Sequence, residues 1–63
     1  MAPGDLILVP GSDGTLAAPG HVGLYLGHGL VVDAADKQLG ILVQTYPDFI
    51  RAGGGLSAIR HLG

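Results

Sequence analysis

The chain has 63 residues, a net charge of −2 and neither cysteine nor tryptophan. This length allows one small domain or part of one, and the lack of cysteine excludes disulfides, thiolate zinc sites and a cysteine nucleophile within these residues. Three basic residues against five acidic ones provide no electrostatic footprint for nucleic acid, and no apolar run approaches the roughly 20 residues of a membrane span.

Composition favours a folded β protein. Hydrophobic residues make up 48% of the chain and charged residues only 13%, the opposite of the signature of disorder. Twelve glycines among so many aliphatic residues indicate short buried strands joined by tight turns. The first residues carry no basic region, so the sequence predicts no signal peptide in this chain.

The first half of the chain predicts three strands. Residues 6–9 form a continuous apolar run bounded by Pro10-Gly11, as in a strand buried on both faces. A loop rich in turn-forming residues covers 11–20. Residues 21–26 then alternate, and 30–34 resume a strand after the breaking sequence Gly-His-Gly, which together predict a hairpin.

The second half predicts two more strands. A polar turn is expected at 36–40, and a fourth strand at 41–46 that Pro47 ends. One helical turn is expected at 48–52 and a last strand at 56–62. The prediction is therefore a mainly β fold, an antiparallel meander of about five strands, in which residues 1–63 form a single partial domain.

Such a sheet poses a packing problem, because an apolar sheet face must be covered by another layer. The chain has no long periodic segment to serve as a covering helix, so either the sheet curls on itself or something outside these residues packs against it, and we expect the second. The apolar surface in question is supplied by Leu6, Leu8, Val22, Leu24, Val31, Val32, Ile41 and Val43.

His21 and Asp33 are the candidate chemical pair, since a carboxylate beside an imidazole orients the ring and stabilises its protonated form. Whether they meet depends on the hairpin register. A three-residue loop makes them diagonal neighbours on one face, a register centred on Gly27 sets them directly opposite, and a two-residue loop places them on opposite faces. From spacing alone, a turn-edge histidine and a solvated aspartate remain an alternative.

Three segments together resemble the NlpC family of cell-wall cysteine peptidases. They are Pro3-Gly4-Asp5 before an apolar strand, His21-Val22-Gly23 in a strand that ends in a Gly-x-Gly turn, and Asp33 twelve positions after the histidine. The resemblance runs over nearly the whole chain, and the middle motif is the more specific. It implies the β half of a papain-like α+β domain, with His21 as the base and Asp33 as the third polar residue.

The resemblance also implies a function that this chain does not complete. The family cleaves the stem peptide of peptidoglycan by acyl transfer through a thiolate, which implies an extracytoplasmic or cell-wall location. The family's cysteine opens a helix upstream of the Pro-Gly-Asp segment. We therefore expect no peptidase activity from the chain alone, and a Cys-bearing helical half, from an upstream segment or another chain, as its partner.

Other assignments stay open at this point. Gly23 and Tyr25 share the His21 face and are candidate substrate-lining residues. Ser12 or Ser57 in a serine triad, and a metal site built on His21, His28 and Asp33 or including His61, are weaker alternatives without a matching motif; no metal or cofactor is predicted. Arg51 and Arg60 are expected to be exposed charges. An alternative from a different functional class is that the chain is a non-catalytic interaction or assembly module that self-associates through its apolar sheet face.

Overall fold

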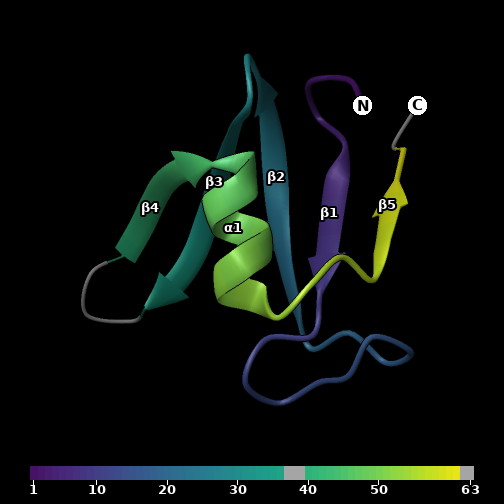
Figure 1. The fold of residues 1–63 in the computed structure, drawn as a ribbon. Coiled ribbons are helices and arrows are strands. Elements are labelled where there is room, and N and C mark those ends of the chain that lie inside the picture. Colours follow the sequence, from purple (N-terminus) through teal and green to yellow (C-terminus); the bar gives the residue numbers. More distant parts are fainter. Residues whose placement is uncertain (37–39, 62–63) are drawn as a thin grey trace.

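The computed structural model describes residues 1–36 and 40–61, and it confirms a mainly β fold with one antiparallel five-stranded sheet and one short helix. The strands are β1 (Leu6–Val9), β2 (His21–Gly27), β3 (Leu30–Asp36), β4 (Gly40–Thr45) and β5 (Ala58–Arg60), and the helix is α1 (Tyr46–Gly53). Figure 1 shows the sheet with α1 in front of it and the end of β5 on the same side as the start of the chain. No helix in the described part of the chain is long and apolar enough to cross a membrane.

The spatial order of the strands is β4-β3-β2-β1-β5, so only the first four form the expected meander. After α1 the chain returns to the far edge of the sheet, where β5 pairs antiparallel with β1 and Ile59 lies opposite Ile7. The last strand is shorter than the predicted 56–62, since it covers three residues. The predicted polar turn at 36–40 falls partly on residues 37–39, which lie outside the described residues.

The β2–β3 hairpin has the register of the predicted three-residue loop, but it reaches that register differently. The turn itself has two residues, His28 and Gly29, both with positive φ (54° and 74°), as two-residue hairpin turns require. Such a turn alone would place His21 and Asp33 on opposite faces. A bulge between Tyr25 and Gly27 inserts one residue, after which Leu24 lies opposite Val32.

Helix α1 covers one face of the sheet, which corrects the expectation that the chain has no helix to do so. It is longer than the predicted turn at 48–52 because both of its ends are capped. The Thr45 hydroxyl accepts a hydrogen bond from the Asp48 amide (3.3 Å), and Gly54 ends the helix in the left-handed conformation (φ 86°). Asp48 near the start and Arg51 near the end also suit the helix dipole.

The core lies between α1 and the sheet. It consists of Phe49 from the helix together with Ile7 and Val9 from β1 and Val31 from β3, each at most 1% exposed. Gly23 makes room for the aromatic ring, since a Cβ there would lie 2.7 Å from Phe49 and 2.6 Å from Val31. We call this face of the sheet, which also carries His21 and Asp33, the inner face.

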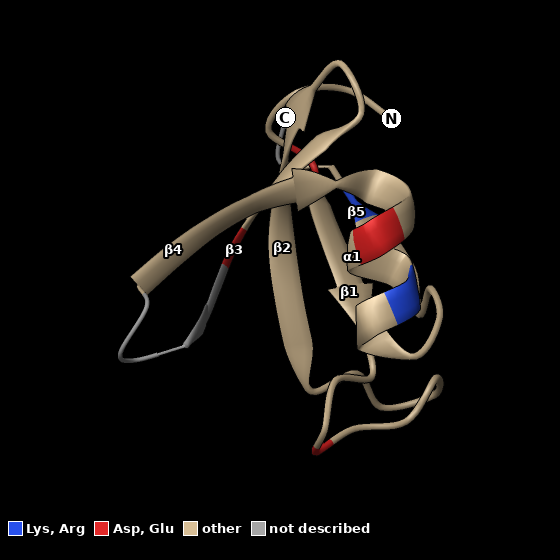
Figure 2. Ribbon diagram, turned by 60° about the vertical axis from the view of Figure 1, so that its left-hand side comes forward, with Lys and Arg blue, Asp and Glu red and all other residues tan. Residues whose placement is uncertain are grey.

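The opposite, outer face is apolar and has no covering layer among the described residues (Figure 2). Strand pairing places the predicted apolar set on it, except Val31, which belongs to the inner face. This arrangement corrects one part of the sequence interpretation. The uncovered face and His21 lie on opposite sides of the sheet, so a helix packed on the uncovered face is not placed to act on the histidine.

Asp5 ties the two ends of the chain together. Its carboxylate accepts hydrogen bonds from the Ala2 amide (2.8 Å) and from Nδ1 of His61 (2.9 Å), and its side chain is 6% exposed. The Pro-Gly-Asp segment therefore has a structural role, closing the turn before β1 and holding the segment that follows β5. These two contacts, the backbone one foremost, lower the pKa of Asp5, and partial burial opposes them.

Replacing Phe49 by alanine should unfold most of the protein. Removing a buried aromatic side chain costs about 3–5 kcal/mol, and a core of this size rarely supplies more than about that amount. We expect loss of the β signal in circular dichroism at 25 °C. Leu16→Ala, in a loop where the side chain is 58% exposed, should change the free energy of unfolding by less than about 0.5 kcal/mol; equal effects of the two changes would contradict the assigned core.

Stability should fall in acid through Asp5. Its pKa is lowered in the folded state, so its contribution is complete above the unfolded value, about 3.9, and is lost as the pH falls through the folded pKa. Urea unfolding between pH 2 and 6 should show this loss below about pH 4. Asp5→Asn should flatten the curve in that range, whereas Asp13→Asn, at an exposed position, should leave its shape unchanged.

Candidate functional site

His21 and Asp33 meet on the inner face of the sheet. His21 begins β2 and Asp33 lies within β3, and the observed register makes them the diagonal neighbours that the three-residue-loop register predicted. A hydrogen bond joins Nε2 of His21 to Oδ1 of Asp33. The side chain of His21 is 31% exposed and that of Asp33 only 7%, so the carboxylate lies below the ring and the ring faces solvent.

A third side chain holds the carboxylate in place. Gln44 of β4 donates a hydrogen bond from Nε2 to the second oxygen of Asp33 (3.1 Å). Each carboxylate oxygen therefore has a partner, and no buried side-chain polar atom of the described residues is left without one. Gln44, which the sequence analysis did not single out, is the one residue with a polar side chain between Gly40 and Thr45.

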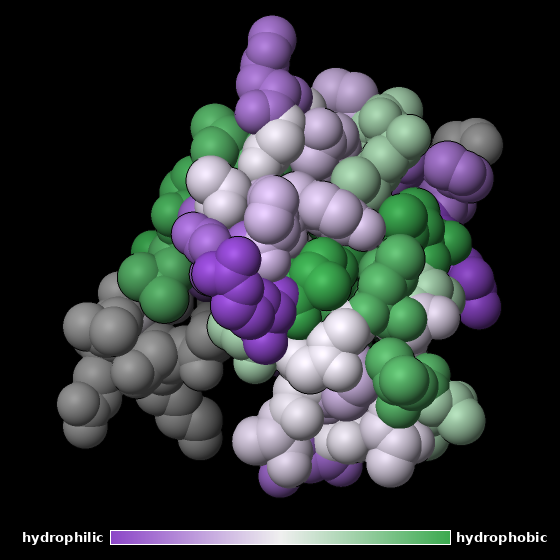
Figure 3. Space-filling view, viewed as in Figure 1, coloured by the Kyte–Doolittle hydropathy of each residue, from purple (hydrophilic) through white to green (hydrophobic). Residues whose placement is uncertain are grey.

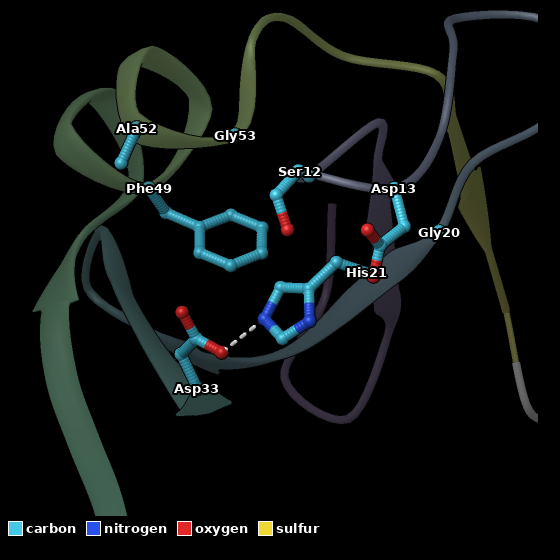
Figure 4. A pocket seen from close by; sticks show the side chains of 9 residues that line it. Ser12, Asp13, Gly20, His21, Asp33, Phe49, Ala52 and Gly53 are labelled. Atoms are coloured by element: carbon cyan, nitrogen blue, oxygen red, sulfur yellow. Dashed lines mark hydrogen bonds and ion pairs between the residues drawn. The ribbon is translucent and has the colours of Figure 1, made fainter. Parts of the chain in front are cut away.

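This arrangement determines which ring nitrogen is available for chemistry. An ionised carboxylate only accepts hydrogen bonds, so Nε2 of His21 carries a proton, and Nδ1 of the neutral ring keeps its lone pair. No hydrogen bond to Nδ1 is found within the described residues. Figure 4 shows Nδ1 on the side of the ring away from Asp33, toward the turn that carries Asp13 and Gly20.

The pair lies in the wall of a cavity of about 340 Å³. The rest of the wall comes from the turn 11–13, from Gly20, and from Phe49, Ala52 and Gly53 of α1. The rings of Phe49 and His21 lie 6.2 Å apart between centroids, so the aromatic side chain is both core and cavity wall. Figure 3 views the molecule from the side of α1, where hydrophilic and hydrophobic surfaces alternate.

A glycine allows the loop to approach His21. Gly11 has a positive φ (67°), and a Cβ there would lie 2.9 Å from Cβ of His21. The Gly11 amide donates to the Gly53 carbonyl (3.0 Å), and the Gly20 amide donates to the Pro10 carbonyl (3.1 Å). The first bond joins the start of the loop to the end of α1, and the second joins the two ends of the loop beside the ring.

The other sequence-predicted residues lie elsewhere or have structural roles. Gly23 is covered by Val31 and Phe49, and the Tyr25 hydroxyl accepts a hydrogen bond from the Gly29 amide in the hairpin turn (2.9 Å). Neither Gly23 nor Tyr25 lines the cavity, so the geometry of the cavity does not support the substrate-lining role predicted for them. Arg51 pairs with Asp48 on the exposed side of α1, and Arg60 lies exposed on β5.

The two serines differ in their distance from the pair. Ser12 lines the cavity with its hydroxyl above the His21 ring (Figure 4), but the described contacts include no hydrogen bond between the two. The Ser57 hydroxyl contacts the Thr15 carbonyl (3.5 Å) and lies outside the cavity wall. The structure thus brings Ser12 near His21 without the base–nucleophile bond that a serine triad shows.

No group of three or more potential metal-ligating side chains is found in residues 1–36 and 40–61. His28 lies exposed in the hairpin turn and His61 is paired with Asp5. The cavity wall itself contains two aspartates, Asp13 and Asp33, and neither lysine nor arginine. Comparisons of the chain with family models, with curated proteins and with solved structures found no match in any of the three.

The proton position on His21 can be measured directly. When the ring is neutral, its ¹⁵N shifts in the wild-type chain should show Nε2 protonated and Nδ1 bare, because Asp33 accepts from Nε2. Asp33→Ala should mix the two tautomers by removing the acceptor. The ring of His28, exposed in its turn, should be the same in both proteins; an unchanged His21 spectrum would contradict the assigned hydrogen bond.

Proposed function

We propose that the chain supplies the base and its orienting carboxylate to a hydrolytic acyl-transfer site whose nucleophile comes from a segment outside these 63 residues. The observation that carries the proposal is the His21–Asp33–Gln44 arrangement, in which Nε2 is held and Nδ1 is left available beside an open cavity. This is the orientation in which an imidazole takes a proton from a nucleophile while a carboxylate stabilises the resulting charge.

The sequence resemblance narrows the nucleophile and the substrate. The motifs around Asp5, His21 and Asp33 resemble those of the NlpC family, which implies a cysteine thiol and the stem peptide of peptidoglycan at the cell wall. The chain contains no cysteine, so the thiol belongs to a Cys-bearing helical half. That half has to enter from the inner face, because the cavity and Nδ1 of His21 are there.

The proposed reaction uses Nδ1 twice. It first takes the proton of the thiol, and the thiolate then attacks the carbonyl carbon of the scissile peptide bond. As that bond breaks, the imidazolium returns the proton to the leaving amine. Nδ1 then takes a proton from a water molecule, whose oxygen attacks the carbonyl carbon of the thioester; the C–S bond breaks, the carboxylic acid is released, and the proton returns to the thiolate. Asp33 stays ionised throughout and Gln44 keeps it in position. A cavity of about 340 Å³ is within the size range of small-ligand sites.

The uncovered apolar surface does not support this function, because it lies on the outer face of the sheet, away from His21 and the cavity. The support consists of the pair itself, its third partner, the cavity and the motif resemblance. A metal-dependent hydrolysis has no comparable support among the described residues, and Ser12 makes no hydrogen bond to the base in the structure.

Reconstitution tests the proposal. The chain alone should not cleave a stem-peptide substrate, and the chain fused to a Cys-bearing helical half of the NlpC family should. In the fused protein His21→Ala should lower kcat/KM by about 10²–10⁴, the usual contribution of general acid–base catalysis. Gln44→Ala, which removes a positioning residue, should lower kcat by about tenfold, and Gln44→Glu, which sets a second carboxylate beside Asp33, should not restore it.

His28→Ala provides the matched control, since this histidine is exposed in the hairpin turn on the same strand pair. It should change kcat/KM by less than about twofold. Cleavage that persists in the His21→Ala fusion would reject the role of base, and cleavage by the unfused chain would reject the need for an external nucleophile.

A further inference from the structure

The imidazole of His21 is prepared to act as a base within this chain alone. Its Nε2 donates to Asp33, whose second carboxylate oxygen is held by Gln44, so Nδ1 of the neutral ring keeps its lone pair. The side chain of His21 is 31% exposed, and no hydrogen bond to Nδ1 is found in the described part of the chain. A base that is oriented and open to solvent can take a proton from water as well as from a thiol.

The cavity beside the ring has room for a small acyl compound. Its volume is about 340 Å³, at the lower end of the range of small-ligand sites. Phe49 and Ala52 supply apolar wall, while the hydroxyl of Ser12 and the carboxylate of Asp13 are polar groups that hold water (Figure 4). A small ester and a water molecule can therefore occupy the cavity together.

Charge in the cavity wall restricts the acyl compound further. Asp13 and Asp33 line the cavity, and neither arginine of the chain does. The last two residues of α1 also contribute to the wall, and the C-terminal end of a helix carries partial negative charge. A carboxylate on the substrate would be repelled, so an uncharged acyl group fits the cavity best.

The leaving group decides which acyl compounds activated water can cleave. The amine of a peptide is a poor leaving group, and a covalent nucleophile helps by splitting that difficult step in two. A phenol leaves readily, so an aryl ester requires only a base that activates water. Ser12 makes no hydrogen bond to His21 among the described contacts, which leaves water as the nucleophile that the ring can activate.

We propose that the chain by itself hydrolyses small, uncharged aryl esters, with His21 as general base. Nδ1 takes a proton from water, and the water oxygen bonds to the acyl carbon. The bond from that carbon to the phenol oxygen then breaks, and the imidazolium gives its proton to this oxygen. A carboxylic acid and a phenol are released and the ring is neutral again. Asp33, a positioning residue, stabilises the imidazolium. The reaction uses the same pair as the proposed function but needs no external thiol.

Hydrolysis of p-nitrophenyl acetate by the unfused chain tests the proposal at about pH 8, where imidazole side chains are largely neutral. The rate should saturate with ester concentration, and kcat/KM should exceed the rate constant of free N-acetylhistidine by at least about tenfold. His21→Gln keeps an amide that can donate to Asp33, so circular dichroism should show an unchanged fold. This variant should lose at least about nine-tenths of kcat/KM.

The other two histidines provide matched controls. His28 is exposed in the hairpin turn, and His61 is paired with Asp5 but lies outside the cavity wall. His28→Gln and His61→Gln should each change kcat/KM by less than about twofold. A loss in either control as large as that in His21→Gln would show imidazole reactivity without a site and would overturn the proposal.

Asp33→Asn tests the positioning role. The asparagine amide can donate to Nε2 of His21, which moves the ring proton to Nδ1 and blocks the base. In a variant with an unchanged circular dichroism spectrum, kcat should fall by at least about tenfold while KM stays the same. An unchanged kcat would overturn the role of the pair.

A charged ester tests the location of the reaction. The mono-p-nitrophenyl ester of glutaric acid carries a carboxylate and should have a kcat/KM at least about threefold lower than the acetate. Asp13→Asn should reduce that difference, whereas Asp48→Asn, which removes an exposed carboxylate outside the cavity wall, should not. Equal effects of the two variants would overturn the assignment to the cavity.

Mass spectrometry of the chain quenched during turnover distinguishes water from a protein nucleophile. The unmodified mass should persist, and an acyl group on Ser12 or on His21 would overturn the role of base. Aryl ester hydrolysis by the unfused chain and stem-peptide cleavage by the fused protein are separate measurements. The first can succeed where the second fails, because only the second needs the external thiol, so the two proposals fail independently.

Discussion

The pairing of β2 with β3 sets the arrangement on both sides of the sheet. With Leu24 opposite Val32, the side chains of His21, Val31 and Asp33 point to one face, and their neighbours in sequence point to the other. Because side chains alternate along a strand, a slip of one residue between β2 and β3 would turn the side chains of one of these strands to the other face. His21 and Asp33 would then lie on opposite faces of the sheet, and Val31 and Gly23 would no longer share the face on which Phe49 packs.

The bulge in β2 is what holds this register. The two-residue turn at His28 and Gly29 is well suited to the hairpin twist, but by itself it would place His21 and Asp33 on opposite faces of the sheet. One inserted residue near Tyr25 returns them to the same face, and the Tyr25 hydroxyl accepts a hydrogen bond from the Gly29 amide across the bulge. Local backbone geometry at the tip of the hairpin thereby controls the contact of an imidazole and a carboxylate far down the strands.

The two faces of the sheet differ in what they carry. On the inner face, one aromatic side chain closes the core and forms a wall of the cavity, so stability and the geometry of the site depend on the same residue. The outer face carries the remaining apolar surface and none of the proposed chemistry. In the proposed function a nucleophile-bearing partner would approach the inner face, where His21, Asp33 and the cavity lie.

Much of this architecture is predictable from the sequence because its signals are local. Apolar alternation and turn residues located the strands to within a few residues, and Pro47 and the glycines located the ends of β4 and α1. The twelve-residue interval between His21 and Asp33 determined that they could meet in two of three registers. Tertiary structure alone decided the rest. Contacts between segments distant in sequence determine four features: the bulge that selects the register, the approach of Gln44 from β4, the packing of α1 over His21, and the separation of the cavity from the uncovered face. These features could not be predicted because the periodicity of a single strand contains no information about which face another segment will cover.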